Sequence, residues 1–400
     1  MTEKSKKPSI RFKGFTDTWE QRKLGAMAYR VNEMSVIEGL PRVEYEDIEA
    51  GQGTLNKSLK EKVSNKKGIL FQHGDILYGK LRPYLKNWLF ADFSGIAVGD
   101  FWVLRSNSVA HSFIYRLLQT PAFDYVANQS SGSKMPRADW KLVSNTEFSF
   151  PVFTEEQEKI GLLFLKLDNL ITLHQRKYER FVNIKKALLE KMFPQGDQKV
   201  PSIRFKGFTD TWEQRKFGTM VQIERGGSPR PIDDYITSAP EGLNWVKIGD
   251  APALGNYITK TSEKIKPSGL PKTREVHPGD LILSNSMSFG KPYIMAINGC
   301  IHDGWLLIRD TKSHFDLKFL CLLLGTDQML MQYKAMASGS TVNNLNKELV
   351  GNTIVAYPQK GEQQVLGQFF EWLDNLITLH QRQVEKLKNI KSALLEKMFV

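Results

Sequence analysis

Cysteine is scarce in this chain, and long apolar runs are missing from it. Cys300 and Cys321 are its two cysteines, too few and too isolated for a disulfide framework or for the paired cysteines of a zinc site. No run of about 18 apolar residues occurs, so we expect no transmembrane helix. The opening residues MTEKSKKPSIRF are basic but have no apolar segment behind them, unlike a secretory signal. These absences predict a protein of the reducing cytoplasm.

The motifs of common enzyme sites are also missing. The chain has no GxxxxGK[ST] loop for nucleotide hydrolysis, no GxSxG and no HExxH. No two prolines are adjacent, which excludes the Pro-Pro-aromatic loop with which amino-methyltransferases hold a flipped base. Gly51-Gln52-Gly53 is too short for a cofactor fingerprint, and the carboxylates of residues 44–49 lack a following lysine at nuclease-like spacing. We therefore expect no catalytic site and no metal site.

Charge does not decide the function. The formal net charge is +12, which invites a nucleic-acid partner. The excess of lysine and arginine is spread thinly along the chain, however, and only Lys4, Lys6 and Lys7 form a basic arm. Charge alone is equally compatible with DNA binding and with an ordinary basic protein.

Internal repetition is the strongest signal. The segment PSIRFKGFTDTWEQRK at Pro8–Lys23 recurs unchanged at Pro201–Lys216, and LDNLITLHQR at Leu167–Arg176 recurs at Leu373–Arg382. The second match continues imperfectly, through NIKKALLEKMF and NIKSALLEKMF. The regions between the blocks, 24–154 and 217–361, differ apart from faint echoes such as GDIL and GDLI. The pattern predicts one fold used twice with two different surfaces; an inert tandem scaffold is the alternative.

The long repeated blocks, 155–193 and 362–400, predict two helices. Residues 154–157 (TEEQ) fit a capping box, and Pro194 ends the first helix. Apolar residues then alternate at spacings of three and four, which is the seam of a coiled coil. The seam positions are Leu167, Ile171, Tyr178, Phe181 and Leu188 in the first block and Leu373, Ile377, Val384, Leu387 and Leu394 in the second. Each helix would be about 58 Å long, and each is the obvious antiparallel partner of the other.

Four polar residues interrupt this seam: His174, Lys185, His380 and Lys391. We expect them to fix the register of the helix pair at some cost in stability. The two histidines lack a Cys, Asp or Glu partner at ligand spacing, so a metal site is disfavoured.

The regions between the blocks are expected to be mixed α/β. Short β-rich runs lie between turn signals at Gly68–Phe71, Phe101–Leu104, Asp280–Leu283 and Trp305–Ile308, and helices are expected at His111–Leu118 and Leu317–Leu324. The predicted fold class is α+β: two mixed α/β domains joined by two long helices in an antiparallel coiled coil, related by a pseudo-twofold internal duplication. The expected parts are 1–154, the helix 155–193, 194–361 and the helix 362–400.

Loops rich in side chains that can read DNA occupy matched places in the two halves. Arg and Lys suit guanine and phosphate, Asn suits adenine, and Ser and Thr suit either. The candidates in the first half are Lys80, Arg82, Tyr84, Lys134 and Arg137, with the segment Arg42–Gly53 as a further loop. In the second half they are Arg225, Ser228, Arg230, Asn285, Ser286, Lys291, Thr341, Asn343 and Asn344. Ordinary surface loops are the alternative interpretation of each stretch.

The repeated SIRFKGFTDTWEQRK openings, the LDNLI helix blocks and the GDIL and GST-x-NNL echoes together resemble the specificity subunit of Type I restriction–modification systems. This resemblance covers nearly the whole chain. It implies two target-recognition domains, each reading one half of a split DNA site, and docking of two methylation subunits and of motor–nuclease subunits on the helices and their flanking repeats. It implies that S-adenosylmethionine, ATP and Mg²⁺ are bound by those partners and not by this chain. One departure is that Gly132–Arg137 lacks the polar NNL run of the second half.

Two other functions remain open from the sequence. A self-sufficient methyltransferase or nuclease would turn over substrate without partners. A coiled-coil scaffold without DNA selectivity would show no salt-dependent, sequence-selective binding. A non-catalytic, DNA-reading subunit is the prediction that the repeats favour.

Overall fold

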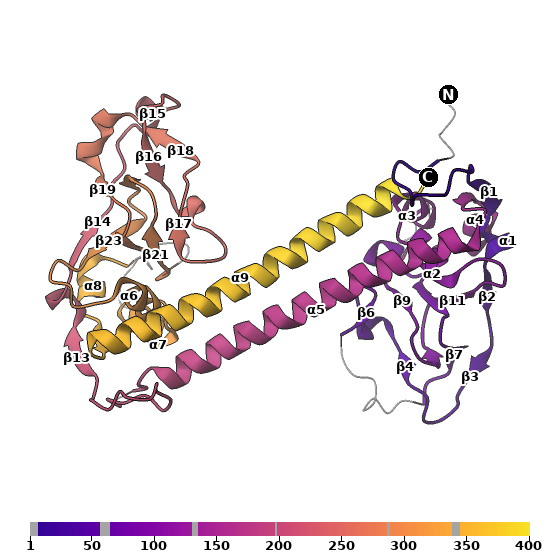
Figure 1. Cartoon of the computed structure of the whole chain (residues 1–400), viewed down its shortest axis with the longest axis horizontal. Helices are drawn as coiled ribbons and strands as arrows, with labels where there is room; N and C mark the ends of the chain where they lie inside the picture. The colour runs from indigo at the N-terminus through magenta and orange to yellow at the C-terminus, as the bar shows by residue number, and fades with distance from the viewer. Residues whose placement is uncertain (1–6, 57–64, 130–134, 197, 286–288, 338–344) are drawn as a thin grey trace. The chain divides into compact units, whose positions relative to one another are not determined.

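The computed structural model, drawn in Figure 1, describes residues 7–56, 65–129, 135–196, 198–285, 289–337 and 345–400. The chain forms two compact units: Met1–His174 with Gln383–Val400, and Gln175–Arg382. Each unit therefore contains part of both long helices, α5 (Thr154–Met192) and α9 (Lys360–Lys397). In the described part of the chain, no helix is long and apolar enough to cross a membrane.

The first unit is built on two four-stranded sheets. One is antiparallel, in the order β2 (Tyr29–Val31), β11 (Phe101–Arg105), β8 (Ile76–Gly79) and β9 (Trp88–Phe90). The other is mixed, in the order β3 (Met34–Ser35), β7 (Gly68–Phe71), β10 (Gly95–Ala97) and β4 (Arg42–Val43). A small hairpin pairs β5 (Ile48–Glu49) with β6 (Thr54–Leu55). The helices are α1 (Leu24–Met27), α2 (His111–Leu117), α3 (Pro121–Ala127) and α4 (Trp140–Asn145).

The second unit repeats this plan with five-stranded sheets. The first runs β14 (Gln222–Arg225), β23 (Trp305–Arg309), β20 (Leu281–Ser284), β21 (Pro292–Met295) and β17 (Tyr257–Ile258). The second runs β15 (Ile236–Thr237), β18 (Glu263–Ile265), β16 (Leu243–Val246), β22 (Gly299–Ile301) and β19 (Arg274–Val276). The helices are α6 (Leu317–Leu324), α7 (Asp327–Ala337) and α8 (Lys347–Gly351). The first sheets share the order of their first four strands, which confirms the expected duplication of a mixed α/β region.

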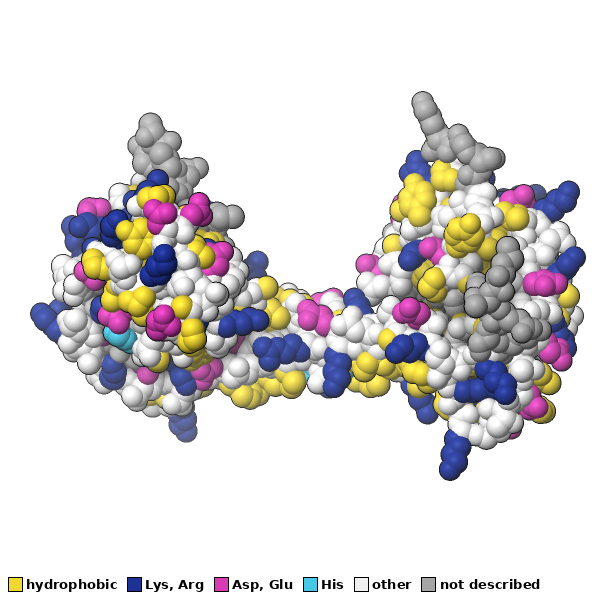
Figure 2. Space-filling view, turned by 90° about the horizontal axis from the view of Figure 1, so that it is seen from above, with side chains coloured by type: hydrophobic (Ala, Val, Ile, Leu, Met, Phe, Trp, Pro, Cys, Tyr) yellow, Lys and Arg dark blue, Asp and Glu magenta, His cyan; other side chains and the backbone are white. Residues whose placement is uncertain are grey.

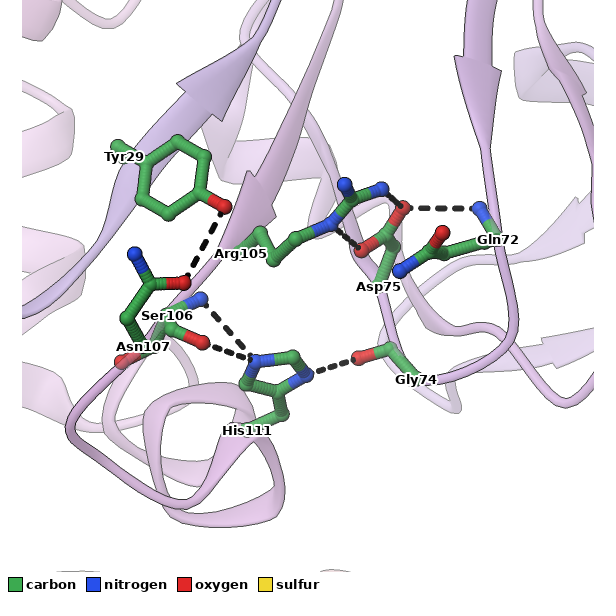
Figure 3. A network of polar contacts seen from close by, with 8 residues as sticks. All are labelled: Tyr29, Gln72, Gly74, Asp75, Arg105, Ser106, Asn107 and His111. Carbon is green, nitrogen blue, oxygen red and sulfur yellow. Dashed lines mark hydrogen bonds and ion pairs between the residues drawn. The ribbon is translucent and has the colours of Figure 1, made fainter.

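The GDIL echo marks a turn that the two units share, and Figure 3 shows the turn of the first unit. Asp75 is fully buried and accepts two hydrogen bonds from Arg105 at 2.7 Å and one from the backbone N–H of Gln72 at 2.8 Å. The preceding Gly74 has φ +89°, a conformation that suits glycine. In the second unit Asp280 likewise accepts from Arg309 and from the N–H of His277. Because Asp280 belongs to this turn, β20 begins one residue later than expected.

The short repeated blocks fasten each unit to the long helices. Arg11 forms a two-point ion pair with the buried Glu156 of α5, and Arg204 forms the same pair with Glu362 of α9. Strand β1 (Glu20–Lys23) pairs with β12 (Glu147–Phe150), and β13 (Glu213–Lys216) pairs with β24 (Ile354–Tyr357). The backbone N–H of Ile10 reaches the carbonyl of Lys397 at 3.0 Å, and that of Ile203 reaches Lys191 at 2.9 Å. These contacts explain why the blocks are repeated: they make identical structural contacts twice.

Each long helix ends by placing a phenylalanine in a unit's core. Phe399 packs on Trp19, Phe113 and Phe164 in the first unit. Phe193 packs on the corresponding Trp212, Phe319 and Phe370 in the second. The expectation that the second helix runs to the end of the chain is wrong by three residues, because Met398–Val400 leave the helix to make this contact.

The start of α5 also differs from the capping box that the sequence predicts. Thr154 is the first helical residue, and the Gln157 side chain is used elsewhere. Its Oε1 accepts from the N–H of Ala110 at 3.0 Å, and its Nε2 donates to the carbonyl of Pro151 at 2.9 Å. In the second unit Gln363 makes the same two bonds, with Asp316 and Pro358. The glutamine thus ties the helix to the preceding strand and to α2 or α6, which a local capping pattern cannot reveal.

Within each unit the two long helices run antiparallel, as expected. The seam residues Leu167, Ile171, Leu373, Ile377 and Val384 are buried, and Phe181, Leu188, Leu387 and Leu394 pack against the cores. Tyr178 is half-buried. The seam lysines meet aspartates of the opposite helix: Lys391 Nζ lies 2.7 Å from Asp168 in the first unit, and Lys185 Nζ lies 2.5 Å from Asp374 in the second. These ion pairs, together with the ring of His380 stacked on Phe181, occupy the polar positions of the seam.

Candidate nucleic-acid interface

In the first unit the fold brings two predicted loops together around Asp100. Leu81 and Arg137 form a β-bridge, and the N–H of Arg82 donates to the carbonyl of Pro136 at 2.7 Å. Lys80 Nζ lies 3.5 Å from Asp100, and Arg137 lies 3.0 Å from the same carboxylate. Arg137 remains 54% exposed, so its guanidinium can exchange this surface partner for another anion.

The adjacent residues are a half-buried cation, Arg82, and an exposed aromatic ring, Tyr84. Arg82 has the left-handed backbone conformation, with φ +50°, at the start of the short helix Pro83–Leu85. Tyr84 follows in that helix and is 53% exposed. Non-glycine residues seldom adopt this conformation, and where they do it often serves a functional loop. The predicted residues Lys80, Arg82, Tyr84 and Arg137 therefore form one described cluster, which we name the Asp100 cluster.

Tyr45 holds the Asp100 cluster in place; it lies within the predicted Arg42–Gly53 segment, but the sequence did not single it out. Its hydroxyl donates to the backbone carbonyl of Asp100 at 2.5 Å and accepts from the N–H of Leu81 at 3.1 Å. Burial raises the pKa of Tyr45 to about 12, so the phenol stays protonated and can donate this bond. The sequence gives little indication of this role, because Tyr45 lies far along the chain from both Leu81 and Asp100, the residues that it joins.

Arg42, at the start of the predicted Arg42–Gly53 loop, has a structural role. It is only 3% exposed. Its guanidinium donates to the backbone carbonyls of four residues: Val36, Ile37, Leu40 and Lys66. A side chain engaged in this way is not available to a DNA base, so the prediction for Arg42 is wrong.

In the second unit the loop after β14 and the end of β20 gather at Asp303. Arg225 Nε donates to the Asp303 carbonyl at 3.2 Å, and Ser228 Oγ donates to its carboxylate at 3.0 Å. The glycines between them allow a close approach, since a Cβ on Gly226 would lie 2.2 Å from the carbonyl oxygen of His302. Sequence reasoning missed both Asp303 and His302, whose Nδ1 lies 2.9 Å from the Asp303 carboxylate. We name this group the Asp303 cluster.

The remaining described candidates of the second unit differ in accessibility. Asn285 is 2% exposed and donates its carboxamide N–H to the Asp303 carbonyl at 2.8 Å, so it supports the loop from inside. Lys291 Nζ lies 5.0 Å from the ring centre of Tyr293, a cation–π contact. Arg230 is exposed. The predicted residues Lys134, Ser286, Thr341, Asn343 and Asn344 lie outside the described residues.

The surface around these clusters has mixed charge. Figure 2 shows Lys and Arg side chains interspersed with Asp and Glu on the visible face of each unit, in agreement with the thinly spread net charge. Discrete clusters, and not one continuous basic face, therefore carry the candidate contacts.

The described residues show neither a metal site nor an activated thiol. Among the described residues no group of three or more His, Cys, Asp or Glu side chains is placed to hold a metal ion. Cys300 and Cys321 are buried, and burial raises the pKa of each thiol to about 12. Neither cysteine is therefore activated as a nucleophile.

The helix seam and the outward helix faces have different roles. Apart from the half-buried Tyr178, the seam residues predicted to serve docking are buried or pack against a unit's core, so they are not free to meet a partner protein. Other apolar side chains on the same helices are exposed, as Figure 2 illustrates. They are Leu162, Leu165, Leu170, Leu173 and Val182 on α5 and Val365, Trp372, Leu379 and Ile390 on α9.

Comparison with known proteins identifies the family. The sequence model described as the Type I restriction modification DNA specificity domain matches residues 17–181 and 209–389. The MjaVIII specificity subunit of Methanocaldococcus jannaschii is 21% identical over 353 residues, which cover 84% of this chain and 79% of that protein. The HindI specificity subunit of Haemophilus influenzae is 27% identical over 238 residues, covering 56% and 51%.

Solved structures show the same fold. The S subunit of a Type I restriction–modification system from M. genitalium aligns with a TM-score of 0.61 at 13% identity, covering 98% of this chain and 99% of that one. A chain from a study of type I complex assembly aligns with a TM-score of 0.54 at 20% identity, covering 94% and 96%. Since the family match spans both units, this chain belongs to the type I restriction–modification DNA specificity family and is a non-catalytic component that supplies DNA sequence specificity.

Proposed function

We propose that each unit reads one half of a two-part DNA site. The observation that carries this proposal is that one structural frame occurs twice with different side chains at matched places. The frame contacts Arg11–Glu156 and Asp75–Arg105 recur as Arg204–Glu362 and Asp280–Arg309. The Asp100 cluster and the Asp303 cluster, in contrast, differ in residue type and spacing. Two half-sites of different sequence require such a difference.

Within each cluster the exposed and half-buried cations are the best candidates for DNA contacts. Arg137 and Arg225 each have a planar guanidinium, which can donate two parallel bonds to guanine. Lys80, Arg82 and Arg230 suit phosphate oxygens, which position a protein without reading sequence. The predicted residues outside the described ranges, among them Lys134 and Asn343, remain part of this proposal.

Partner subunits supply the chemistry in this proposal. The exposed apolar side chains of α5 and α9 form a surface of the kind that protein partners cover. Two methylation subunits would dock there, and motor–nuclease subunits would join the full complex. S-adenosylmethionine, ATP and Mg²⁺ would be bound by these partners, and the complex would act in the cytoplasm.

Exchange of one recognition region tests the proposal. Residues 24–154 are replaced by the corresponding region of another specificity subunit, the hybrid is assembled with its methylation partners, and methylated sites are mapped across a genome. We expect one half of the recognised sequence to change and the other half to stay. A hybrid that keeps both halves, or changes both, would refute the assignment of one half-site to each unit.

Two controls separate the other functions. Turnover by the purified chain with cofactor and without partners would identify it as a self-sufficient enzyme. Contacts to DNA phosphates release counterions, so a DNA-reading protein binds in a salt-dependent way. Binding that is neither salt-dependent nor sequence-selective would favour a simple scaffold.

A further inference from the structure

A pocket of about 430 Å³ lies in the first unit, away from the Asp100 cluster. Its wall combines the β5–β6 turn and Trp88 at the start of β9 with residues of α5 and α9. Figure 1 shows β6 and β9 beside α5 in this unit. The volume is within the range of small-molecule sites. Three lysines, Lys86, Lys388 and Lys391, line it, and Asp168 is the one carboxylate among its lining residues.

The charges around this pocket do not balance. Asp168 accepts an ion pair from Arg116 at 2.6 Å and another from Lys391 at 2.7 Å, so one carboxylate serves two cations. Arg116 is 3% exposed and Lys391 13% exposed, so water compensates little of this excess. Lys86 and Lys388 are exposed and have no ion-pair partner among the described residues.

The second unit shows that the repeated frame does not require this arrangement. There the matching cavity has a similar volume, about 460 Å³, and the carboxylates Glu190 and Asp327 line it. Asp374 pairs with one cation, Lys185, because Leu322 occupies the position that corresponds to Arg116. Val182 occupies the position of Lys388. The cations Arg116 and Lys388 are therefore specific to the first unit.

We propose that this pocket binds a phosphate group, held by Lys86, Lys388 and Lys391. Lysine ammonium groups act as point charges toward phosphate. Three of them around one opening match the charge of a phosphate dianion better than that of a carboxylate ligand, which carries a single charge. The phosphate comes either from a small phosphorylated molecule or from a DNA backbone. The inference does not depend on which unit reads which half-site.

Lys388→Ala in the full-length chain tests the site, because Lys388 is exposed and supports no other contact among the described residues. The matched control is Lys186→Ala, an exposed lysine on α5 in the second unit. Calorimetric titration with inorganic phosphate and with a nucleoside monophosphate measures binding of free phosphate. Fluorescence anisotropy with duplexes of several sequences, over a range of salt, measures binding of the DNA backbone.

If the ligand is free phosphate, the unaltered chain binds it in the calorimetric titration. Lys388→Ala then weakens this binding about tenfold, because one charge-assisted bond is lost, and Lys186→Ala leaves it unchanged. If the ligand is a phosphate of the DNA backbone, free phosphate does not bind. Lys388→Ala then loses a similar amount of affinity for every duplex, and the slope of log affinity against log salt concentration falls by about one. The inference is overturned if Lys388→Ala binds both probes like the unaltered chain, or if Lys186→Ala weakens binding equally. Neither outcome bears on the half-site exchange experiment.

Discussion

At the scale of single residues, the frame depends on a few ion pairs between arginine and a carboxylate, each formed twice. Asp75 and Glu156 are fully buried, and each meets an arginine through two hydrogen bonds. The planar fork of arginine matches the carboxylate, and the remaining lone pairs of Asp75 take a backbone N–H. Removing one member of such a pair leaves a buried charge without compensation, so these positions dominate the stability of each unit.

Asp75→Ala is expected to destabilise the first unit by about 3 kcal/mol, because Arg105 and the Gln72 N–H lose their acceptor. The exposed pair of Glu20 and Arg22 provides the control, and Glu20→Ala should cost about 0.5 kcal/mol or less. Chemical denaturation followed by circular dichroism measures both. Equal losses for the two variants would show that burial does not decide the strength of these pairs.

Asp280 makes the stability of the second unit sensitive to acid. Burial alone would raise the pKa of Asp280, but the hydrogen bonds from Arg309 and the His277 N–H outweigh it, and the pKa lies below its ordinary value of 3.8. The stabilisation is therefore complete above that ordinary value and is lost as the pH falls through the lower pKa of the folded state. Thermal unfolding between pH 7 and about pH 2 should show this loss, and Asp280→Asn should reduce the slope. An unchanged slope in the variant would refute the assignment.

At the scale of elements, the long helices pass close to the short helices of each unit. Gly161 of α5 lies against α2, where a Cβ would fall 2.1 Å from Ser112 Oγ. Gly367 of α9 lies in the same way against the start of α6, 2.9 Å from the backbone nitrogen of Phe319. A glycine inside a helix usually lowers the stability of that helix. The close approach of the neighbouring short helix explains why glycine occurs at both positions.

Gly161→Ala is expected to destabilise the first unit although alanine is the better helix former. The clash with Ser112 should outweigh a gain of about 1 kcal/mol in helix propensity. Gly361→Ala is the matched control, because the nearest atom to its new Cβ would be 3.9 Å away. The melting temperature should fall for Gly161→Ala and stay or rise for Gly361→Ala. A rise for both would argue against tight packing of α5 on α2.

At the scale of the whole molecule, α5 and α9 join the two units through 39 and 38 helical residues. Each helix is about 58 Å long at 1.5 Å per residue. If each unit reads one half-site, the helices set how many base pairs lie unread between the halves.

Insertion of one helical turn after Leu173 in α5 and after the matching Leu379 in α9 is expected to lengthen the unread spacer. A turn adds about 5.4 Å, or between one and two base pairs, and both half-sites should stay the same. Methylation mapping of the assembled complex measures the spacer. An active complex with the original spacer would refute the role of the helices as a ruler.

The sequence by itself determined the duplicated architecture. Repeats, helical periodicity and alternating β-rich runs are local or direct features, so they placed α5, β7, β11 and α6 within one residue and α9 within three. The family resemblance came from the same blocks and was confirmed by comparison. The proposed reading loops also followed from the sequence, because the GDIL and GST echoes align the two halves.

Only the tertiary structure decided which side chains are available. Arg42 and Asn285 resemble DNA-reading residues in the sequence, yet both are buried and bonded to backbone carbonyls. Tyr45, Asp100 and Asp303 organise the clusters through contacts between segments far apart in the chain. The same holds for the phosphate pocket, whose charge imbalance arises where Arg116, Asp168 and Lys391 meet from three separate helices. Composition and periodicity describe neighbours along the chain, whereas burial and charge pairing depend on neighbours in space.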